Sequence, residues 1–311
     1  MSRQNYYWQR QVRQKAQVDE SLVCQLVRAE RQRQPRLGGR KLWRLLKEEL
    51  AAAGVELGRD RFFEVLRRQG LLMPRRRRYC RTTDSRHSFR VYKNLARDLV
   101  LTGPHQLLVS DITYVRTREG FMYLALVMDA WSRKIVGYDG SDSLEAEGAR
   151  RALKMALKQL PAEAKAVHHS DRGTQYCCSE YVALAQGGGL VISMTEENHC
   201  YENAKAERLN GILKQEYGLG EELSSKAEAR RLVQQAVGLY NTHRPHTALG
   251  YAVPAAVHQA ALGREGTGAV MPLAGSLRLL EATVANARVP PAPAPSLACY
   301  EEQARQVLVR T

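Results

Sequence analysis

The chain lacks the features that mark a secreted or membrane protein. Its 311 residues include only six cysteines, none of them in a Cys-x-x-Cys pair and two of them adjacent. We therefore expect no disulfide framework and interpret the cysteines as those of a protein in the reducing cytosol. The most apolar run, residues 121–128, ends at Asp129, and the N-terminal residues carry charge where a signal peptide has an apolar core. We therefore expect no membrane partner and a cytoplasmic location.

Acidic side chains are scarce in the first third of the chain. Residues 1–100 contain 25 Lys and Arg but only 10 Asp and Glu, and the rest of the chain contains 22 of each, so the whole net charge of +15 lies in this third. A surface with this charge attracts a polyanion. The hydrophobic share of 44% suffices for a sizeable core, which excludes a wholly disordered or fibrous protein, and the length favours two domains.

Residues 19–73 have the apolar spacing of three helices. Short glycine-containing breaks separate the helices, as is typical of a helix-turn-helix. The third helix, about residues 59–69, carries basic side chains that either read a DNA groove or form a solvated basic face: Arg59, Arg61, Arg67 and Arg68. We predict an all-α helix-turn-helix DNA-binding domain here, preceded by a basic N-terminal segment over residues 1–18.

A basic linker is predicted over residues 74–102. It has little apolar periodicity and begins with four consecutive arginines, Arg75, Arg76, Arg77 and Arg78. Because adjacent like charges repel one another unless phosphates lie between them, we expect this linker to follow a DNA duplex. The alternative is a solubilising tether.

Residues 103–260 have a mixed pattern of strands and helices. The predicted order is βββαβαβα with a final helix, which is typical of an α/β core with a mixed sheet. The expected strands are 106–116, 121–129, 134–140, 166–169 and 190–193, and the expected helices are 144–160, 179–186, 201–217 and 225–241. The Gly- and Pro-rich tail over residues 261–311 is interpreted as a linker with a short docking helix.

Three carboxylates of this core are candidates for phosphoryl-transfer chemistry. Asp111 lies within an apolar strand, where an ionised carboxylate is costly without a cation. Asp171 directly follows the fourth strand, and 35 residues, enough for a helix and a strand, separate it from Glu207. Carboxylates at one sheet edge are ligands for Mg²⁺, and two such ions about 4 Å apart would hold the attacking and leaving oxygens. Taken singly, each residue has a structural alternative: a turn former, a helix cap or a surface residue.

Five segments form a specific set of motifs, namely SDITYVRT, LVMDAWSRKIVGY, HHSDRGTQY, NHCYENAKAERLNGILKQE and YNTHRPHTALGY. With them, residues 19–258 resemble the second-frame transposases of the insertion-sequence-three family, in the retroviral-integrase superfamily. The resemblance implies a ribonuclease-H-like core with a DDE triad of Asp111, Asp171 and Glu207 and two Mg²⁺ ions, for which Mn²⁺ substitutes. It also implies that water, and then a DNA 3′-hydroxyl, attacks a phosphodiester without a covalent enzyme intermediate.

Further residues of these motifs are candidate DNA contacts. Lys214 lies two helical turns after Glu207 on the same face, and it matches the basic residue with which integrase relatives contact terminal nucleotides. A solvated lysine is the alternative. Asn203, four residues before Glu207, shares this face and is a candidate for orienting a phosphate or a metal-bound water. Arg172, beside Asp171, is a candidate for binding a phosphate or pairing with an acid.

Zinc is not expected. The histidines at 168–169 point to opposite faces of a strand, and with the cysteines at 177–178 they lack a regular ligand spacing. His243 and His246 belong to the Arg-Pro-His turn of the family motif. There we interpret Arg244 and His246 as contacts to backbone or DNA.

Double-stranded DNA, as inverted repeats and as target, is the expected partner, with a homo-oligomer assembled on it. The resemblance also implies a first-frame helix-turn-helix protein, separate or fused by a frameshift, and a bacterial nucleoid-associated location. Two other functions stay open: a DNA-binding regulator without catalysis, and a ribonuclease-H-type nuclease or resolvase. The three carboxylates favour an enzyme over the regulator, and Lys214 with the basic helical domain favours a transposase over the nuclease.

Overall fold

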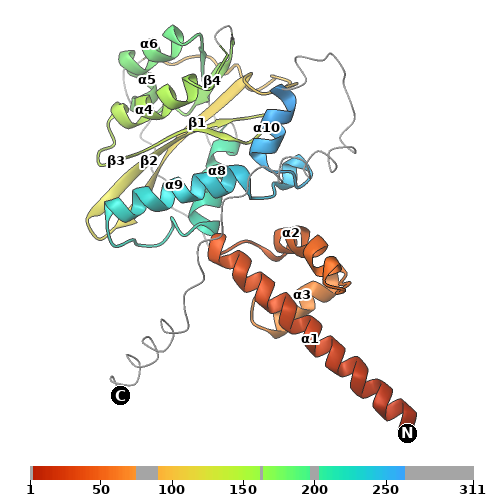
Figure 1. The fold of residues 1–311 in the computed structure, drawn as a ribbon. Helices are drawn as coiled ribbons and strands as arrows, with labels where there is room; N and C mark the ends of the chain where they lie inside the picture. The colour runs from red at the N-terminus through yellow and green to blue at the C-terminus, as the bar shows by residue number, and fades with distance from the viewer. Residues whose placement is uncertain (1–2, 75–89, 162–163, 197–202, 263–311) are drawn as a thin grey trace. The chain divides into compact units, whose positions relative to one another are not determined.

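Three helices open the computed structural model, which describes residues 3–74, 90–161, 164–196 and 203–262 (Figure 1). They are α1 (Arg3–Arg33), α2 (Gly39–Ala52) and α3 (Arg59–Arg68). Val27 of α1, Leu42 of α2 and Phe62 of α3 are completely buried in a small shared core. The apolar spacing therefore identified all three helices of this all-α region.

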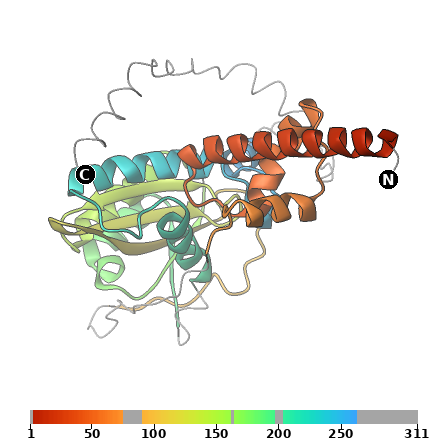
Figure 2. The same cartoon turned by 90° about the horizontal axis from the view of Figure 1, so that it is seen from below.

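Helix α1 begins at Arg3, whereas the sequence pattern placed the start of the helical domain at residue 19. Residues 3–18 contain no Gly or Pro and are rich in Arg and Gln, which are good helix formers, so the helix continues without an apolar stripe. In both views α1 runs past α2 and α3 (Figures 1 and 2). The expected separate N-terminal segment is thus a continuation of the first helix. The four linker arginines, at 75–78, and the tail after residue 262 lie outside the described residues.

A mixed five-stranded sheet has the order β3-β2-β1-β4-β5. The strands are β1 (Leu107–Thr117), β2 (Gly120–Asp129), β3 (Ile135–Ser141), β4 (Val167–Ser170) and β5 (Val191–Met194). The first three form an antiparallel meander, and β4 and β5 extend the sheet from β1 as parallel strands. Every predicted strand is confirmed, with ends within one residue of those expected.

Helices cover both faces of this sheet (Figure 1). Helices α4 (Ala146–Leu157), α5 (Thr174–Cys177) and α6 (Ser179–Gly187) lie on one face, and α8 (Ala204–Glu216) and α9 (Lys226–Thr242) lie on the other. On β2, Val127 packs toward α4 while Leu126 and Met128 pack toward α9, as the alternation of a strand requires. Burial on both faces explains the apolar run over residues 124–128.

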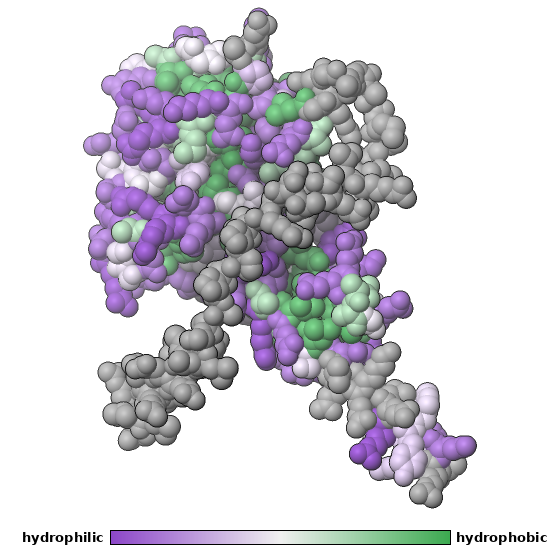
Figure 3. Space-filling view, in the orientation of Figure 1, coloured by the Kyte–Doolittle hydropathy of each residue, from purple (hydrophilic) through white to green (hydrophobic). Residues whose placement is uncertain are grey.

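On the face that Figure 3 shows, most described residues at the surface are hydrophilic, with hydrophobic residues in separate areas between them. Among the described residues, none of the helices combines the length and the apolarity that crossing a bilayer requires. The apolar run noted in the sequence is instead a central strand of the core.

Other features of the fold were also not predicted from the sequence. Helix α10 (Pro254–Leu262) follows a short 3-10 turn, η1 (Thr247–Leu249), and its His258 Nδ1 lies 2.9 Å from Ser132 Oγ. The alanine-rich sequence of α10 has only a weak apolar stripe, so its periodicity is poor. Gly137 of β3 allows a close approach of α4, because a Cβ atom there would lie 2.1 Å from the carbonyl oxygen of Ala152.

Candidate active site

Asp111 and Asp171 lie at the edge where two parallel strands separate. The pairing of β1 with β4 ends at Val109 and His169. The same register carried two residues further places Asp111 opposite Asp171, which directly follows β4. The structure therefore brings together the two aspartates that the sequence predicted to be neighbours.

Glu207 lies in the first turn of α8, and two asparagines hold this helix against β1. The side-chain amide of Asn203 donates to the carbonyl oxygen of Ser110 at 3.0 Å, and the amide of Asn210 donates to Oδ2 of Asp111 at 2.7 Å. These asparagines stand four residues before and three residues after Glu207, so all three share one helix face. Glu207 is thus held on the side of α8 that meets Asp111.

Local backbone groups orient both aspartates. Oδ1 of Asp111 accepts a hydrogen bond from the N–H of Ile112 at 2.9 Å, and Oδ1 of Asp171 accepts one from the N–H of Gly173 at 3.1 Å. Both carboxylates are half-buried, as is Glu207. The site is therefore a partly sheltered edge at which backbone hydrogen bonds fix two carboxylates.

The electrostatics of the site are unfavourable for three ionised carboxylates. Burial raises the pKa of Asp111 well above its usual value, and the negative charges of Asp171 and then Glu207 raise it further. A hydrogen bond from Ile112 and the positive charge of Lys214 act in the opposite direction. The three acids therefore lie close enough to repel one another.

The donor set fits a hard divalent cation. In the part of the chain that the structure describes, no three acidic, histidine or cysteine side chains stand close enough together to hold an ion as they are. However, carboxylate oxygens are the ligands that Mg²⁺ prefers, and a divalent charge would relieve the repulsion at Asp111. Asp111, Asp171 and Glu207 are the residues that would hold it.

Lys214 lies beside this site on α8. Its side chain is half-buried, and its Nζ lies 4.1 Å from the centre of the Tyr114 ring on β1. This cation–π contact, together with the effect of the lysine's charge on the pKa of Asp111, places Lys214 at the carboxylate edge. The prediction that Lys214 contacts DNA is not tested by this placement, but the lysine is not a fully solvated one.

Three other predicted residues lie away from the carboxylates or point elsewhere. Nε of Arg172 donates to the carbonyl oxygen of Thr195 at 2.6 Å. Arg244 is only 2% exposed, and its guanidinium donates to both carboxylate oxygens of Glu216, at 2.7 and 3.0 Å. His246 is half-buried, and its pKa is lowered to about 4, first by burial and then by the charge of Arg244. Because the guanidinium of Arg244 forms a buried ion pair with Glu216, we do not propose Arg244 as a DNA contact.

The basic side chains of α3 lie on the surface. All four are exposed, and an open hollow beside α3 is lined by Arg40, Arg59, Arg61 and Arg67 together with Asp60, Phe63 and Glu64. Arg59 pairs with Asp60 at 2.8 Å and Arg68 pairs with Glu20 at 2.7 Å. The basic surface that the sequence predicted on this helix is therefore present, and its DNA contacts stay a prediction.

The histidines considered for zinc are part of the core. His168 is fully buried and hydrogen-bonds with Ser110 Oγ at 2.8 Å and Tyr181 OH at 2.9 Å. His169 Nδ1 lies 2.8 Å from Ser193 Oγ. Burial lowers the pKa of His168 to about 3, so this ring is neutral.

Sequence reasoning missed Asn210 and Tyr114. Asn210 lies three residues after Glu207, on the same face as Asn203 and Lys214, and this spacing was the available signal. Tyr114 lies on the strand of Asp111, but its contact with Lys214 depends on how α8 packs.

Comparison with known proteins gives first the class. A family model described as Integrase core domain matches residues 102–200, and a second of the same description matches residues 189–254. These ranges contain all five strands and the three carboxylates. The solved HTLV-2 integrase catalytic core domain, in complex with magnesium, has 14% identity and a TM-score of 0.40 over 50% of this chain and 98% of that one, too distant to add to the assignment. The matched region is an integrase-type core.

Two relatives then identify the family. The chain is 34% identical to the Insertion element IS600 uncharacterized 31 kDa protein of Shigella sonnei, over 83% of this chain and 95% of the relative. It is 36% identical to Transposase InsF for insertion sequence IS3A of Escherichia coli (strain K12), over 66% of this chain and 72% of the relative. The chain belongs to the IS3 family of DDE transposases, which confirms the resemblance of its motifs and its ribonuclease-H-like fold.

Proposed function

We propose that this transposase cleaves DNA at the ends of an insertion element and joins the freed 3′-hydroxyl to target DNA. The observation that carries the proposal is the cluster of Asp111, Asp171 and Glu207, in which burial and then the charges of the other two carboxylates raise the pKa of Asp111. Such an arrangement is characteristic of a site built for a charged ligand. The three carboxylates would hold two Mg²⁺ ions, or Mn²⁺ in their place. When bound, these ions supply stabilisation of the attacking and leaving oxygens.

The residues around the triad position it and the DNA. Asn203 and Asn210 hold α8 on β1, which keeps Glu207 in register with Asp111. The ammonium of Lys214 acts as a point charge that neutralises a phosphate next to the reacting one. In this proposal the protein orients the strand, and no side chain becomes covalently attached to DNA.

The remaining parts of the proposal concern partners. The net charge of residues 1–100 and the exposed arginines of α3 support binding of double-stranded DNA, both inverted repeats and target. Because an element has two ends to be joined, we propose a homo-oligomer on DNA. In this proposal the oligomer also contains a first-frame helix-turn-helix protein, either as a separate chain or fused to this one by a frameshift. The assembly acts on the bacterial nucleoid in the cytoplasm.

The direct experiment is incubation with labelled DNA that carries the element's own inverted repeats, with and without Mg²⁺. Specific cleavage and joining that depend on the metal are expected. Binding without cleavage would support the alternative, a catalytically inactive regulator. Cleavage of any DNA without joining would instead indicate a nuclease of the same fold.

Salt should weaken DNA binding steeply, because phosphate contacts release counterions. We expect the log of affinity to fall with the log of salt concentration by about 0.9 per neutralised phosphate. Replacing Arg61 and Arg67 by Gln should reduce this slope by about one for each arginine. Fluorescence anisotropy over a salt series measures both. Arg151→Gln, whose guanidinium is held by Asp139, is the matched control, and an unchanged slope in the α3 variant would remove α3 from the DNA surface.

Lys214→Ala should strongly reduce joining of the element end, because the charge that positions the strand is lost. Lys214→Arg should restore part of the joining, since it keeps the charge. The free energy of unfolding, measured by thermal denaturation, should change by at most about 1 kcal/mol, the scale of a cation–π contact. Lys154→Ala, an exposed lysine of α4 on the other face of the sheet, is the control. Normal joining by the Lys214→Ala variant would withdraw Lys214 from the site.

A further inference from the structure

We propose that aromatic side chains of the β1–β2 hairpin form a stacking site for unpaired DNA bases beside the carboxylates. The site, here called the aromatic platform, consists of Tyr114, Phe121 and Tyr123. The inference rests on the proposed DNA cleavage and names the part of the substrate that this edge of the core would hold. It implies that the DNA end is opened before it reacts.

The hairpin gathers these rings on one face. The antiparallel register places Tyr114 opposite Tyr123 and Arg116 opposite Phe121, and cross-strand partners point to the same side of a sheet. The rings of Tyr114 and Phe121 meet edge to face, with centres 5.3 Å apart. Phe121 is 43% exposed and both tyrosines are half-buried. The platform therefore offers aromatic surface to a ligand.

Cations accompany both outer rings. Nζ of Lys214 lies 4.1 Å from the centre of the Tyr114 ring, and Cζ of Arg116 lies 5.9 Å from the centre of the Phe121 ring. Aromatic faces combined with positive charge are how proteins bind single-stranded nucleic acid, because bases stack on the rings while the cations meet the phosphates. This charge complementarity selects a DNA strand as the occupant, since an apolar protein partner would have to bury both cations.

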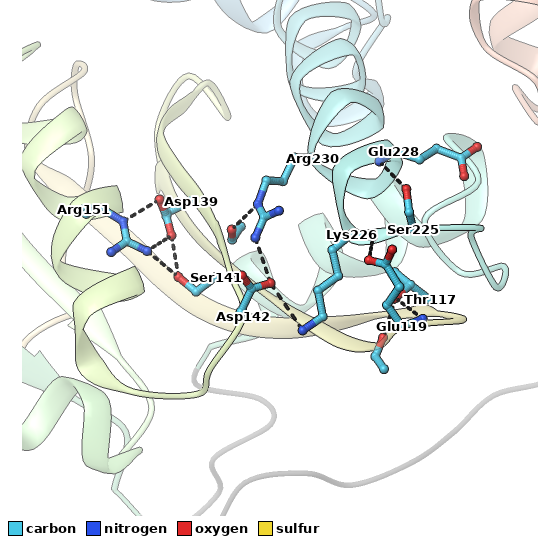
Figure 4. A network of polar contacts seen from close by, with 12 residues as sticks. Thr117, Glu119, Asp139, Ser141, Asp142, Arg151, Ser225, Lys226, Glu228 and Arg230 are labelled. Atoms are coloured by element: carbon cyan, nitrogen blue, oxygen red, sulfur yellow. Dashed lines mark hydrogen bonds and ion pairs between the residues drawn. The ribbon is translucent and has the colours of Figure 1, made fainter.

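The hairpin that carries the platform is anchored near its turn (Figure 4). The carboxylate of Glu119 accepts a hydrogen bond from the N–H of Lys226 at 2.8 Å, and Thr117 Oγ1 donates to the carbonyl oxygen of Gly120 at 2.6 Å. The N–H of Leu223 also donates to the carbonyl oxygen of Arg116 at 3.0 Å. A surface that is ordered before binding loses little conformational freedom when a base stacks on it.

The platform meets the carboxylate edge through Lys214, whose Nζ contacts the Tyr114 ring and whose charge acts on Asp111. Tyr114 follows Asp111 by three residues on β1, about 10 Å along a strand, and this odd spacing places their side chains on opposite faces of the sheet. Because the pairing of β1 with β4 ends at Val109, a DNA strand that passes around this edge of β1 would reach both residues. Successive nucleotides of a stacked strand are about 3.4 Å apart, so a base on Tyr114 would be at least about three steps from a phosphate at Asp111. A base inside a duplex cannot stack on a protein ring. The terminal base pairs must therefore open.

The test uses the full chain without Mg²⁺ and a DNA duplex whose end is unpaired and carries 2-aminopurine. Stacking on the platform should quench 2-aminopurine fluorescence when the protein binds. In the double variant Tyr114→Leu, Phe121→Leu, the quenching should be lost. The preference for the unpaired over the paired end should fall by about tenfold, the loss of roughly one base stack. Tyr114→Phe keeps the ring and should behave like the wild type.

Controls separate this inference from the proposed function and from misfolding. Tyr92→Leu removes a tyrosine that also lies beside an arginine, Arg90, at 5.0 Å, but is outside the platform, and it should leave the quenching unchanged. Wild-type protein that binds both DNA ends equally, or double-variant protein that still quenches, would overturn the platform while leaving the proposed function standing. No DNA binding by the wild type would instead overturn the proposed function. Circular dichroism checks that each variant folds, and Phe121→Leu alone replaces the double variant if that one does not.

Discussion

Loss of DNA strand cleavage with nearly unchanged DNA binding is the expected result of replacing any one triad carboxylate. The variants are Asp111→Asn, Asp171→Asn and Glu207→Gln. Each removes a negative charge that the proposed ions need, while the basic surface of the first third stays intact. Cleavage of labelled element ends in Mg²⁺ and fluorescence anisotropy in its absence measure the two properties.

Stability gives a second measurement of the same site. Because the pKa of Asp111 is raised in the folded chain, its ionised form opposes folding, and stability is lost as pH rises through that pKa. Asp111→Asn should therefore raise the melting temperature without metal and remove stabilisation by added Mg²⁺. Asp142→Asn, at an exposed carboxylate paired with Arg230, is the control for both measurements. Cleavage by a triad variant above a few per cent of the wild-type rate would refute the triad assignment.

Arg244→Met should lower the free energy of unfolding by roughly 3 kcal/mol, because it leaves a mostly buried carboxylate without its main partner. Burial alone would raise the pKa of Glu216, but the hydrogen bond and the charge of Arg244 lower it. The pair therefore stabilises the fold above the ordinary pKa of a glutamate, and this contribution is lost as pH falls through the lowered pKa. Lys41, whose Nζ lies 2.6 Å from the same carboxylate, limits the effect. Urea unfolding at neutral and acidic pH measures it.

A surface ion pair supplies the comparison for Arg244. Arg151 pairs with Asp139 and is 46% exposed, so Arg151→Met should change the free energy of unfolding by less than about 1 kcal/mol (Figure 4). An Arg244→Met variant of normal stability that binds DNA poorly would contradict the buried role. It would return Arg244 to the DNA-contacting residues.

Patterns within short stretches of sequence made the strands predictable, together with the place of each triad residue relative to them. In β2, the continuous apolar run that contains Leu126 and Val127 is a local property, and so is the position of Asp171 directly after β4. Asp111 and Asp171 meet because both follow the same stretch of parallel pairing, which the order of the strands implies. Charge is likewise a property of composition, so the basic first third was evident at once.

Weakly patterned segments were predicted less well. In helix α10, the alanine-rich sequence around His258 shows little separation of apolar and polar residues, and α1 continues to Arg3 without an apolar stripe. In both segments helix propensity or tertiary contact, not periodicity, decides the structure. The first helix therefore begins earlier than its apolar spacing predicted, and α10 was not predicted.

Motif chemistry and strand order, both written in the sequence, determined the class of this protein and its candidate triad. Tertiary structure alone decided which polar residues serve that triad. Arg244 and Lys214 are both basic residues within motifs, yet one is buried against Glu216 and the other lies over Tyr114 at the site. Asn210 contacts Asp111 across 99 residues of chain. Such contacts depend on where a helix packs against a strand, and local sequence periodicity carries no information about the partner that a side chain meets there.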